Sequence, residues 1–303
     1  MRITHILILS SVFAFAIHGQ GQAPDPNFPA KVANPAYSGN GPGVLFDEGH
    51  HNVHTMQSGY EAFAALMASD GYRMEPNRST FTPGALAGHR ILVIVNARGV
   101  GNDAPMPARA RPAFTDAECL AVRDWVRDGG SLLLVADHYP IGDATEKMAQ
   151  QFGVQMSKGV TMDPANSARD LGGPASLVFS RANKLLGDHA ITRGRNESET
   201  VNRIVSFTGQ SLVGPKGSTA FMLLSGTAVD VARPSGQRAS AAGKCQGLAM
   251  EFGKGRVVVL GEAAMLSAQL AGPRRRPMGM NAPGTDDRQL ALNIMHWLSH
   301  LLN

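Results

Sequence analysis

The run Ile91-Leu92-Val93-Ile94-Val95 decides the fold class of this chain. It is apolar throughout and mostly β-branched, the pattern of a strand that is covered on both faces in a parallel sheet. A second buried run, Leu132 to Val135, follows a predicted helix that opens with the capping box Thr115-Asp116-Ala117-Glu118 and closes at Gly129-Gly130. Strands that alternate with helices predict an α/β fold with a doubly wound, mainly parallel sheet.

The same patterns predict further elements on both sides of these two strands. Apolar runs predict strands over 44–47 and 72–75 and a hairpin of two strands over 247–252 and 256–260; helical spacing predicts helices over 59–69, 143–152, 263–270 and 286–302. Residues 157–245 are rich in Gly, Ser and Asn and predict a less regular, β-rich insertion. We therefore expect one α/β domain over 43–303, preceded by an extended lead-in over 24–42.

The first 23 residues have the pattern of a secretory signal peptide. Arg2 precedes an apolar segment from Ile6 to Ile17, and a polar stretch ends at Ala23. The apolar segment has about 12 residues, short of the roughly 20 that cross a bilayer. We expect cleavage, a periplasmic or secreted protein, and no stable membrane insertion.

Charge and cysteine content restrict the partners. The net charge is only +4, and the tract Arg274-Arg275-Arg276 is predicted to be a solvated loop, so nucleic acid is not expected as a partner. Cys119 shares a predicted helix face with Val122 and Val126 and is expected in the core. A disulfide with Cys245 is permitted in an oxidising compartment, but the spacing does not require one.

The best functional clue is the segment Asp47-Glu48-Gly49-His50-His51-Asn52-Val53-His54, which directly follows a predicted strand. Carboxylates and imidazoles bind divalent metals and exchange protons near neutral pH. Polar loops also follow strands for purely structural reasons, and their histidines then cap helices or bind the backbone. Both interpretations remain open for this segment.

Polar residues follow the other predicted strands too: Asn96, Asp137-His138 and Glu262. Ligands of open α/β sheets bind beyond the carboxyl ends of the strands, so we expect one shared crevice. We expect Glu48, His138 and Glu262 to be catalytic. Asn96, Asp137 and His51 are expected to bind the substrate. If a divalent metal is bound, its expected ligands are His50, His51 and Asp137. His54 ranks lower, because Gly49 leaves it uncertain whether a helix begins early enough to place it beside His50.

Several stretches resemble the class I glutamine amidotransferase-like superfamily and, within it, domain-of-unknown-function family 4350. They are Phe46 to Asn52, Trp125 to Ser131 leading into Ala136-Asp137-His138, Gly261 to Met265, and Asn281 to Gly284. The resemblance implies a flavodoxin-like sheet, akin to trehalose-utilisation and gliding-motility-type domains, and no particular activity. Amidotransferases place a nucleophilic cysteine at the turn after a central strand. Because Asp137-His138 stands there instead, glutamine hydrolysis through a thioester is not expected.

Two functions therefore remain. The first is an exported hydrolase that uses the carboxylate and histidine crevice with or without a divalent metal. The alternative is a non-catalytic envelope module that binds a carbohydrate or a protein with the same crevice.

Overall fold

The computed structural model describes residues 21–102, 110–169, 171 and 173–303. Most of the predicted signal segment, residues 1–20, lies outside them. Its end does not: β1 (Gln22–Pro24) pairs with β16 (Ala268–Ala271), with Ala23 opposite Leu270. The predicted cleavage point after residue 23 thus falls inside a paired strand. Of the described helices, none combines the length and the apolar character needed to span a membrane.

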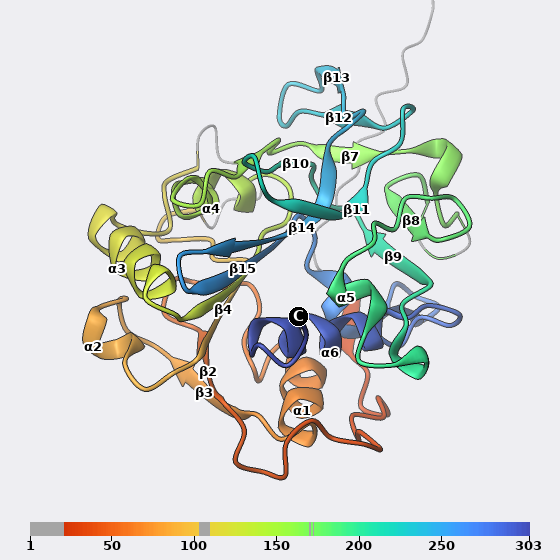
Figure 1. Cartoon of the computed structure of the whole chain (residues 1–303). Coiled ribbons are helices and arrows are strands. Elements are labelled where there is room, and N and C mark those ends of the chain that lie inside the picture. Colours follow the sequence, from red (N-terminus) through yellow and green to blue (C-terminus); the bar gives the residue numbers. More distant parts are fainter. Residues whose placement is uncertain (1–20, 103–109, 170, 172) are drawn as a thin grey trace, which may run out of the picture.

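Within the described residues, nine strands form one large sheet (Figure 1). The strand order is β3-β2-β4-β5-β15-β14-β10-β6, and β11 also pairs with β14. Their bounds are β2 (Gly43–Asp47), β3 (Arg73–Asn77), β4 (Ile91–Val95), β5 (Ser131–Val135), β6 (Gln155–Met156), β10 (Leu212–Val213), β11 (Thr219–Leu223), β14 (Cys245–Phe252) and β15 (Gly255–Leu260). The predicted α/β class and the predicted hairpin, β14 and β15, are confirmed.

Five neighbouring strands, β3, β2, β4, β5 and β15, are all parallel. Counted in chain order, they lie in the order 2-1-3-4-5, which places the reversal of strand order between β2 and β4. Their carboxyl ends share one edge of the sheet, so the residues that follow them (Glu48, Arg78, Asn96, Ala136 and Gly261) begin the loops of that edge.

Both faces of the sheet carry a hydrophobic core. In β4, Ile91, Val93 and Val95 contribute to one core and Leu92 and Ile94 to the other. Figure 1 shows the helices divided accordingly: α1 (Glu61–Ser69) and α6 (Asp287–Leu298) pack on the first face, and α2 (Pro83–Leu86), α3 (Asp116–Arg127) and α4 (Ile141–Gln150) on the second. The prediction of a strand covered on both faces is confirmed, because β4 is buried along its whole length.

The capping box predicted at Thr115 is present: its side chain accepts from the Glu118 amide, and the Glu118 carboxylate accepts from the Thr115 amide. Cys119 points inward from this helix and is buried, as expected. Cys245 is buried in β14, and both cysteines are free.

The regular elements of the segment 157–245 are mainly short strands, joined by longer irregular stretches. Besides β10 and β11 it holds β7 (Val160–Met162), β8 (Ser176–Ser180), β9 (Arg203–Phe207), β12 (Val229–Val231), β13 (Arg238–Ser240) and the short helix α5 (Ala190–Arg193). β10 and β11 join the large sheet, β7, β12 and β13 form a small one, and β8 pairs with β9.

One predicted element is wrong. Instead of a helix over 263–270, a single 3-10 turn (Ala264–Leu266) precedes β16, which pairs with β1 on one side and with β17 (Arg276–Gly279) on the other. The segment 268–271 is a strand because two other segments satisfy its backbone groups, and local apolar spacing does not report such distant pairing.

Candidate functional site

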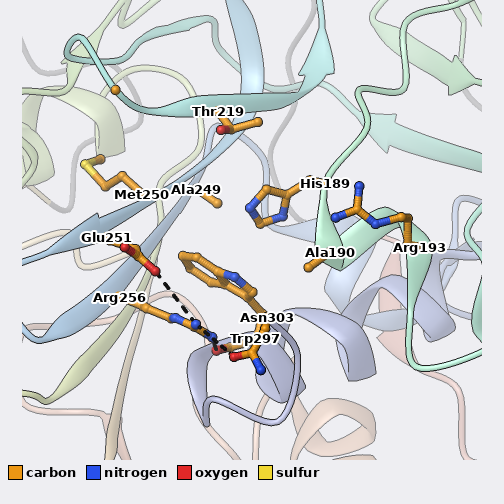
Figure 2. Close-up of a pocket in the computed structure, with 11 residues that line it drawn as sticks. His189, Ala190, Arg193, Thr219, Ala249, Met250, Glu251, Arg256, Trp297 and Asn303 are labelled. Carbon is orange, nitrogen blue, oxygen red and sulfur yellow. Dashed lines mark hydrogen bonds and ion pairs between the residues drawn. The ribbon is translucent and has the colours of Figure 1, made fainter.

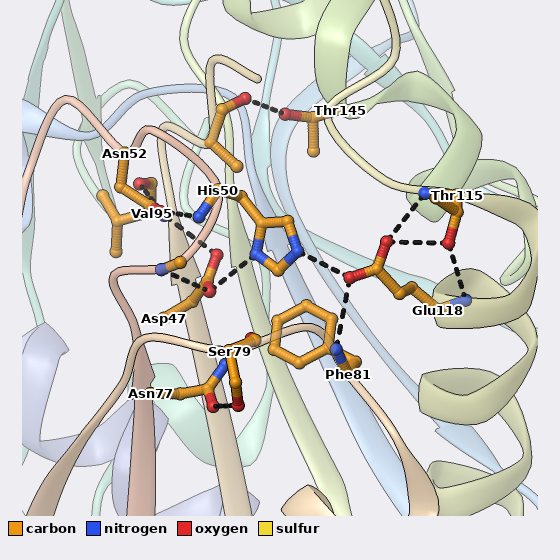
Figure 3. Close-up of polar contacts among 12 residues, drawn as sticks. Asp47, His50, Asn52, Asn77, Ser79, Phe81, Val95, Thr115, Glu118 and Thr145 are labelled. Carbon is orange, nitrogen blue, oxygen red and sulfur yellow. Dashed lines mark hydrogen bonds and ion pairs between the residues drawn. The ribbon is translucent and has the colours of Figure 1, made fainter. Parts of the chain in front are cut away.

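His50 is the centre of a buried network at the end of β2 (Figure 3). Its Nδ1 lies 2.8 Å from Asp47 Oδ1, and its Nε2 lies 2.8 Å from Glu118 Oε1. The ring packs against Phe81 and Phe114, with centroid distances of 4.6 and 4.7 Å; these two rings stack on each other 5.9 Å apart, and His50 is only 6% exposed. Both nitrogens of His50 therefore have protein partners, and two aromatic rings pack against its own ring.

These contacts favour a protonated His50. An ionised carboxylate can only accept hydrogen bonds, so a ring that bonds to two of them must donate from both nitrogens. Burial by itself lowers the pKa of His50, but the bonds and charges of Asp47 and Glu118 outweigh it and raise the pKa overall. Burial likewise raises the pKa of Glu118, and its bonds to Thr115 and His50 lower it by more. The result is a buried imidazolium held between two carboxylates.

Sequence reasoning did not predict Glu118 as part of this network. The capping box predicts only its contacts with Thr115, which use Oε2. Oε1 accepts from His50 and from the Phe81 amide, 3.2 Å away. No local pattern indicates a partner that lies 68 positions away in the sequence.

Asn52 occupies the place where the strand order reverses. Its Nδ2 donates to Asp47 Oδ2 at 3.0 Å and to the Val95 carbonyl at 3.1 Å, and its backbone forms a bridge with Ala97. Such folds usually bind ligands in the crevice beyond β2 and β4. Here the loop after β2 crosses that crevice, and Asn52 hydrogen-bonds to both of its sides.

Asp137, beyond the end of β5, is the centre of a second and more open cluster. Its Oδ2 accepts from Asn96 Nδ2 at 2.6 Å, its Oδ1 accepts from the Ala263 amide at 2.9 Å, and its own amide donates to Asn96 Oδ1 at 3.0 Å. Asn96 adopts a left-handed conformation, with a φ of 45°. Backbone strain of this kind is frequent at functional sites, and here it orients the amide that holds the half-buried Asp137 carboxylate.

Glu262 lies next to this cluster but is only 1% exposed. Its two carboxylate oxygens accept from the Ala264 amide at 2.7 Å and the Met265 amide at 2.9 Å. Burial, followed by the charge of Asp137, raises the pKa of Glu262 to about 8. Its position suits a group that holds a proton near Asp137 rather than one that touches a ligand.

His54, which the sequence ranked low, lies on the same side as Asp137. Burial lowers the pKa of His54, and the nearby charges of Asp137 and Glu61 offset part of that effect. The ring packs against Tyr60, with centroids 5.2 Å apart, and the Tyr60 hydroxyl donates to the Ala263 carbonyl at 2.6 Å. His54 is brought to the cluster by the turn before α1, whose path the spacing of apolar residues does not reveal.

Of the remaining predicted residues, Glu48 and His138 form hydrogen bonds outside the Asp137 network. His138 is half-buried, and its Nδ1 is 2.8 Å from the Tyr139 carbonyl. Because a carbonyl only accepts, Nδ1 carries the proton and Nε2 of the neutral ring keeps a lone pair. His51 is exposed, with a φ of 52°. Glu48 accepts from the Met56 amide at 3.0 Å and from Arg78 Nε at 3.2 Å, which uses both of its oxygens.

The structure brings Asn96, Asp137 and Glu262 together, and it does not gather His50, His51 and Asp137 as a ligand set. Within the described ranges, no group of three or more His, Cys, Asp or Glu side chains is arranged to hold a metal ion. Neither cysteine stands at the turn after β5. Burial raises the pKa of Cys119 to about 11 and that of Cys245 to about 12, so neither offers an activated thiolate.

No protein-family profile matches the chain, and no protein of curated function resembles its sequence. Solved structures do match it in fold. The mmIFT52 N-terminal domain superposes with a TM-score of 0.60 at 15% identity, covering 85% of this chain and 97% of that one. Cytoplasmic Protein STM3548 from Salmonella typhimurium gives 0.50 at 10% identity, covering 85% and 98%. A protein described as ThuA-like, from Bacteroides uniformis, gives 0.43 at 10% identity, covering 88% and 93%. At these identities, the two higher scores show a shared fold alone.

Proposed function

We propose that this protein is an exported hydrolase of small esters or amides whose site is the cluster around Asp137. The observation that carries the proposal is that a half-buried carboxylate, fixed by Asn96 and the Ala263 amide, stands beyond the central strand β5 with His138 beside it in the chain. Around it, burial moves the pKa of His54 down and that of Glu262 up. Environments that separate the pKa values of neighbouring groups are typical of acid–base sites.

The reaction proposed here needs only side chains of this chain. Nε2 of His138 accepts a proton from a water molecule, and the water oxygen adds to the substrate carbonyl carbon. The same nitrogen then returns the proton to the departing alcohol or amine, so the ring ends as it began. Asp137 accepts a hydrogen bond from a substrate hydroxyl and orients the substrate. No metal is assigned to this mechanism, because the described side chains supply no ligand set.

The proposal includes a family and a location. The chain is proposed to be a divergent member of the class I glutamine amidotransferase-like group, close to domain-of-unknown-function family 4350, with a flavodoxin-like sheet. The strand order 2-1-3-4-5 supports the sheet type. Export is supported only by the pattern of residues 1–23. Expression of the full gene, followed by fractionation and amino-terminal sequencing of the product, tests it; a product that keeps Met1 in the cytoplasm would refute export.

Turnover tests the activity. Purified protein without a histidine tag is assayed on acetylated sugars, nitrophenyl esters and anilides. His138→Gln is expected to lower kcat/KM by roughly a hundredfold or more, the usual contribution of a general base. His89→Gln, at a histidine that bonds to Glu75 and precedes β4 at the opposite edge of the sheet, is the control and is expected to retain full activity. Absence of turnover on every substrate, or equal activity in wild type and His138→Gln, would contradict the proposal.

A second function is favoured by one observation: Glu48, His50 and Glu262 all have their polar atoms bonded within the protein. Such a site is better suited to holding a shape than to proton transfer. In this alternative the protein is a non-catalytic module that binds a carbohydrate at Asp137. It predicts a rise in melting temperature with mono- or disaccharides, no turnover, and loss of the shift in Asp137→Asn.

A further inference from the structure

A cavity of about 380 Å³ lies at the opposite edge of the sheet, near the amino ends of the parallel strands (Figure 2). Arg256, one of its lining residues, stands at the start of β15 opposite Ser131, whereas Glu262 follows the end of the same strand. The other lining residues come from α5, α6, β11, β14 and the loops beside them. This cavity is therefore separate from the Asp137 cluster.

The decisive feature is a buried cation without a close counter-ion. Arg256 is 6% exposed, and its Nη1 donates to the carbonyls of Trp297 and Leu302 at 2.8 and 2.6 Å. Its Nη2 donates to Asn303 Oδ1 at 3.5 Å, its ion pair with Glu251 is long, 3.8 Å, and the Glu251 side chain is 77% exposed. Arg256 Nε is buried and has no hydrogen-bond partner. A guanidinium in this position gains from an anion more than an exposed one does, because burial has already removed much of its water.

The rest of the lining combines a flat apolar surface with hydrogen-bond donors. Trp297 is only 4% exposed; the Arg256 guanidinium lies over its ring at 4.8 Å, and the His189 ring is 5.2 Å away. His189 Nδ1 accepts from the Ile191 amide at 3.2 Å, so its proton lies on Nε2, which is a donor. Burial, and then the charge of Arg193, lowers the pKa of His189 to about 4. Thr219, whose side chain stands above His189 in Figure 2, adds a hydroxyl.

We propose that this cavity binds a small molecule in which a carboxylate or phosphate group is attached to an aromatic or similarly flat body. The anionic group faces Arg256, and the flat body lies against Trp297. Arg193 also lines the cavity, but its side chain is exposed and pairs with Asp188 at 2.7 Å, so it is a secondary cation whose charge Asp188 partly offsets. The proposal does not depend on hydrolysis at Asp137.

Tryptophan fluorescence provides a direct measurement. The chain has two tryptophans, so Trp125→Phe leaves Trp297 as the sole indole. Benzoate and phenyl phosphate serve as probes, and benzyl alcohol is their neutral counterpart. Both anions are expected to change the emission of Trp297 saturably, with Kd values at least about tenfold below that of benzyl alcohol, the factor that corresponds to about 1.4 kcal/mol.

Variants then test the residues. Arg256→Gln is expected to raise the Kd of both anions roughly tenfold or more, and Thr219→Val by a smaller factor. Arg238→Gln, an exposed arginine of β13, is the charge-matched control and should leave the Kd unchanged. If Arg256→Gln does not fold, Thr219→Val and Arg193→Gln carry the test. Equal affinity for benzoate and benzyl alcohol, or anion binding that none of these variants weakens, overturns the proposal.

Discussion

The Nε2 atom of His50 lies 2.8 Å from Oε1 of Glu118. This contact joins the loop after β2 to the first turn of α3, and the Glu118 carboxylate is held in place by hydrogen bonds that it accepts from the Thr115 and Phe81 amides. The sequence predicts His50 as a metal ligand. In the structure its role is instead to link the loop after β2 to α3. The strength of this link can be measured.

Glu118→Gln is expected to lower the free energy of unfolding by about 2 to 4 kcal/mol. The glutamine NH2 group would face another donor, at His50, Phe81 or Thr115. The substitution also removes one of the two negative charges beside the buried imidazolium. Asp116→Asn in the same turn, at a side chain that is 84% exposed, is the control and should cost less than about 1 kcal/mol. Urea unfolding of wild type and both variants measures these changes in the free energy of unfolding. Equal losses would mean that the His50 contact adds nothing to stability.

The difference between what the sequence predicts and what it misses follows from the range of the interactions. β4 was predictable because burial on both faces leaves a continuous apolar run, and α3 because its capping box is local. The strand β16 was missed because one partner, β1, is about 250 residues away in the chain, and the other, β17, begins at Arg276 inside the arginine tract that was expected to be a loop.

The candidate site shows the same limit. The polar residues at the strand ends were predictable, and Asn96, Asp137 and Glu262 do lie together. Which of the loop histidines faces them was not predictable. His50 turns into the core against two phenylalanines, His51 is exposed to solvent, and His54 lies beside Asp137. Three residues of one type within five positions differ only through packing against distant segments.

The pH dependence of the His50 and Glu118 pair follows from the direction of their pKa shifts. The pKa of His50 is raised from 6.5, so its stabilisation is complete below that pH and is lost as pH rises through the raised value. The pKa of Glu118 is lowered from 4.5, so its stabilisation is complete above that pH and is lost as pH falls through the lowered value. A double-mutant cycle of His50→Gln and Glu118→Gln should give the largest coupling energy between these two pH values. A coupling that keeps growing above pH 6.5 would show that His50 is neutral in the folded protein.

Backbone strain at Asn96 can be tested by comparing the free energies of unfolding of its alanine and glycine variants. Both Asn96→Ala and Asn96→Gly remove the two hydrogen bonds to Asp137, but only alanine pays for the left-handed conformation at a φ of 45°. Asn96→Ala should therefore be less stable than Asn96→Gly by about 1 kcal/mol, the reverse of the usual order in strands and helices. Thermal or urea unfolding measures the difference. If Asn96→Ala is the more stable of the two variants, the backbone at this position is not strained.

The two cysteines should be unreactive while the protein is folded. Both side chains are buried, and burial raises the pKa of Cys119 to about 11 and of Cys245 to about 12. Iodoacetamide reacts with thiolates, so mass spectrometry should find almost no alkylation of native protein and two modified thiols after unfolding in urea. Rapid modification of either native thiol, or two thiols that stay blocked in unfolded protein without reductant, would contradict this arrangement.

Glu262 is expected to make the protein less stable as pH rises toward 8. The pKa of Glu262 is raised from 4.5 to about 8, so between these values the unfolded chain has released a proton that the folded chain retains. Unfolding therefore becomes easier with rising pH, by up to about 1.4 kcal/mol per pH unit. Glu262→Gln replaces the titrating carboxyl group with an amide, so this pH dependence is lost. The variant is destabilised at low pH, where its side-chain amide opposes the Ala264 or Met265 amide, and it should regain stability relative to wild type as pH rises. Urea unfolding at a series of pH values tests this, and parallel curves for the two proteins between pH 4.5 and 8 would show that Glu262 is already ionised in the folded state.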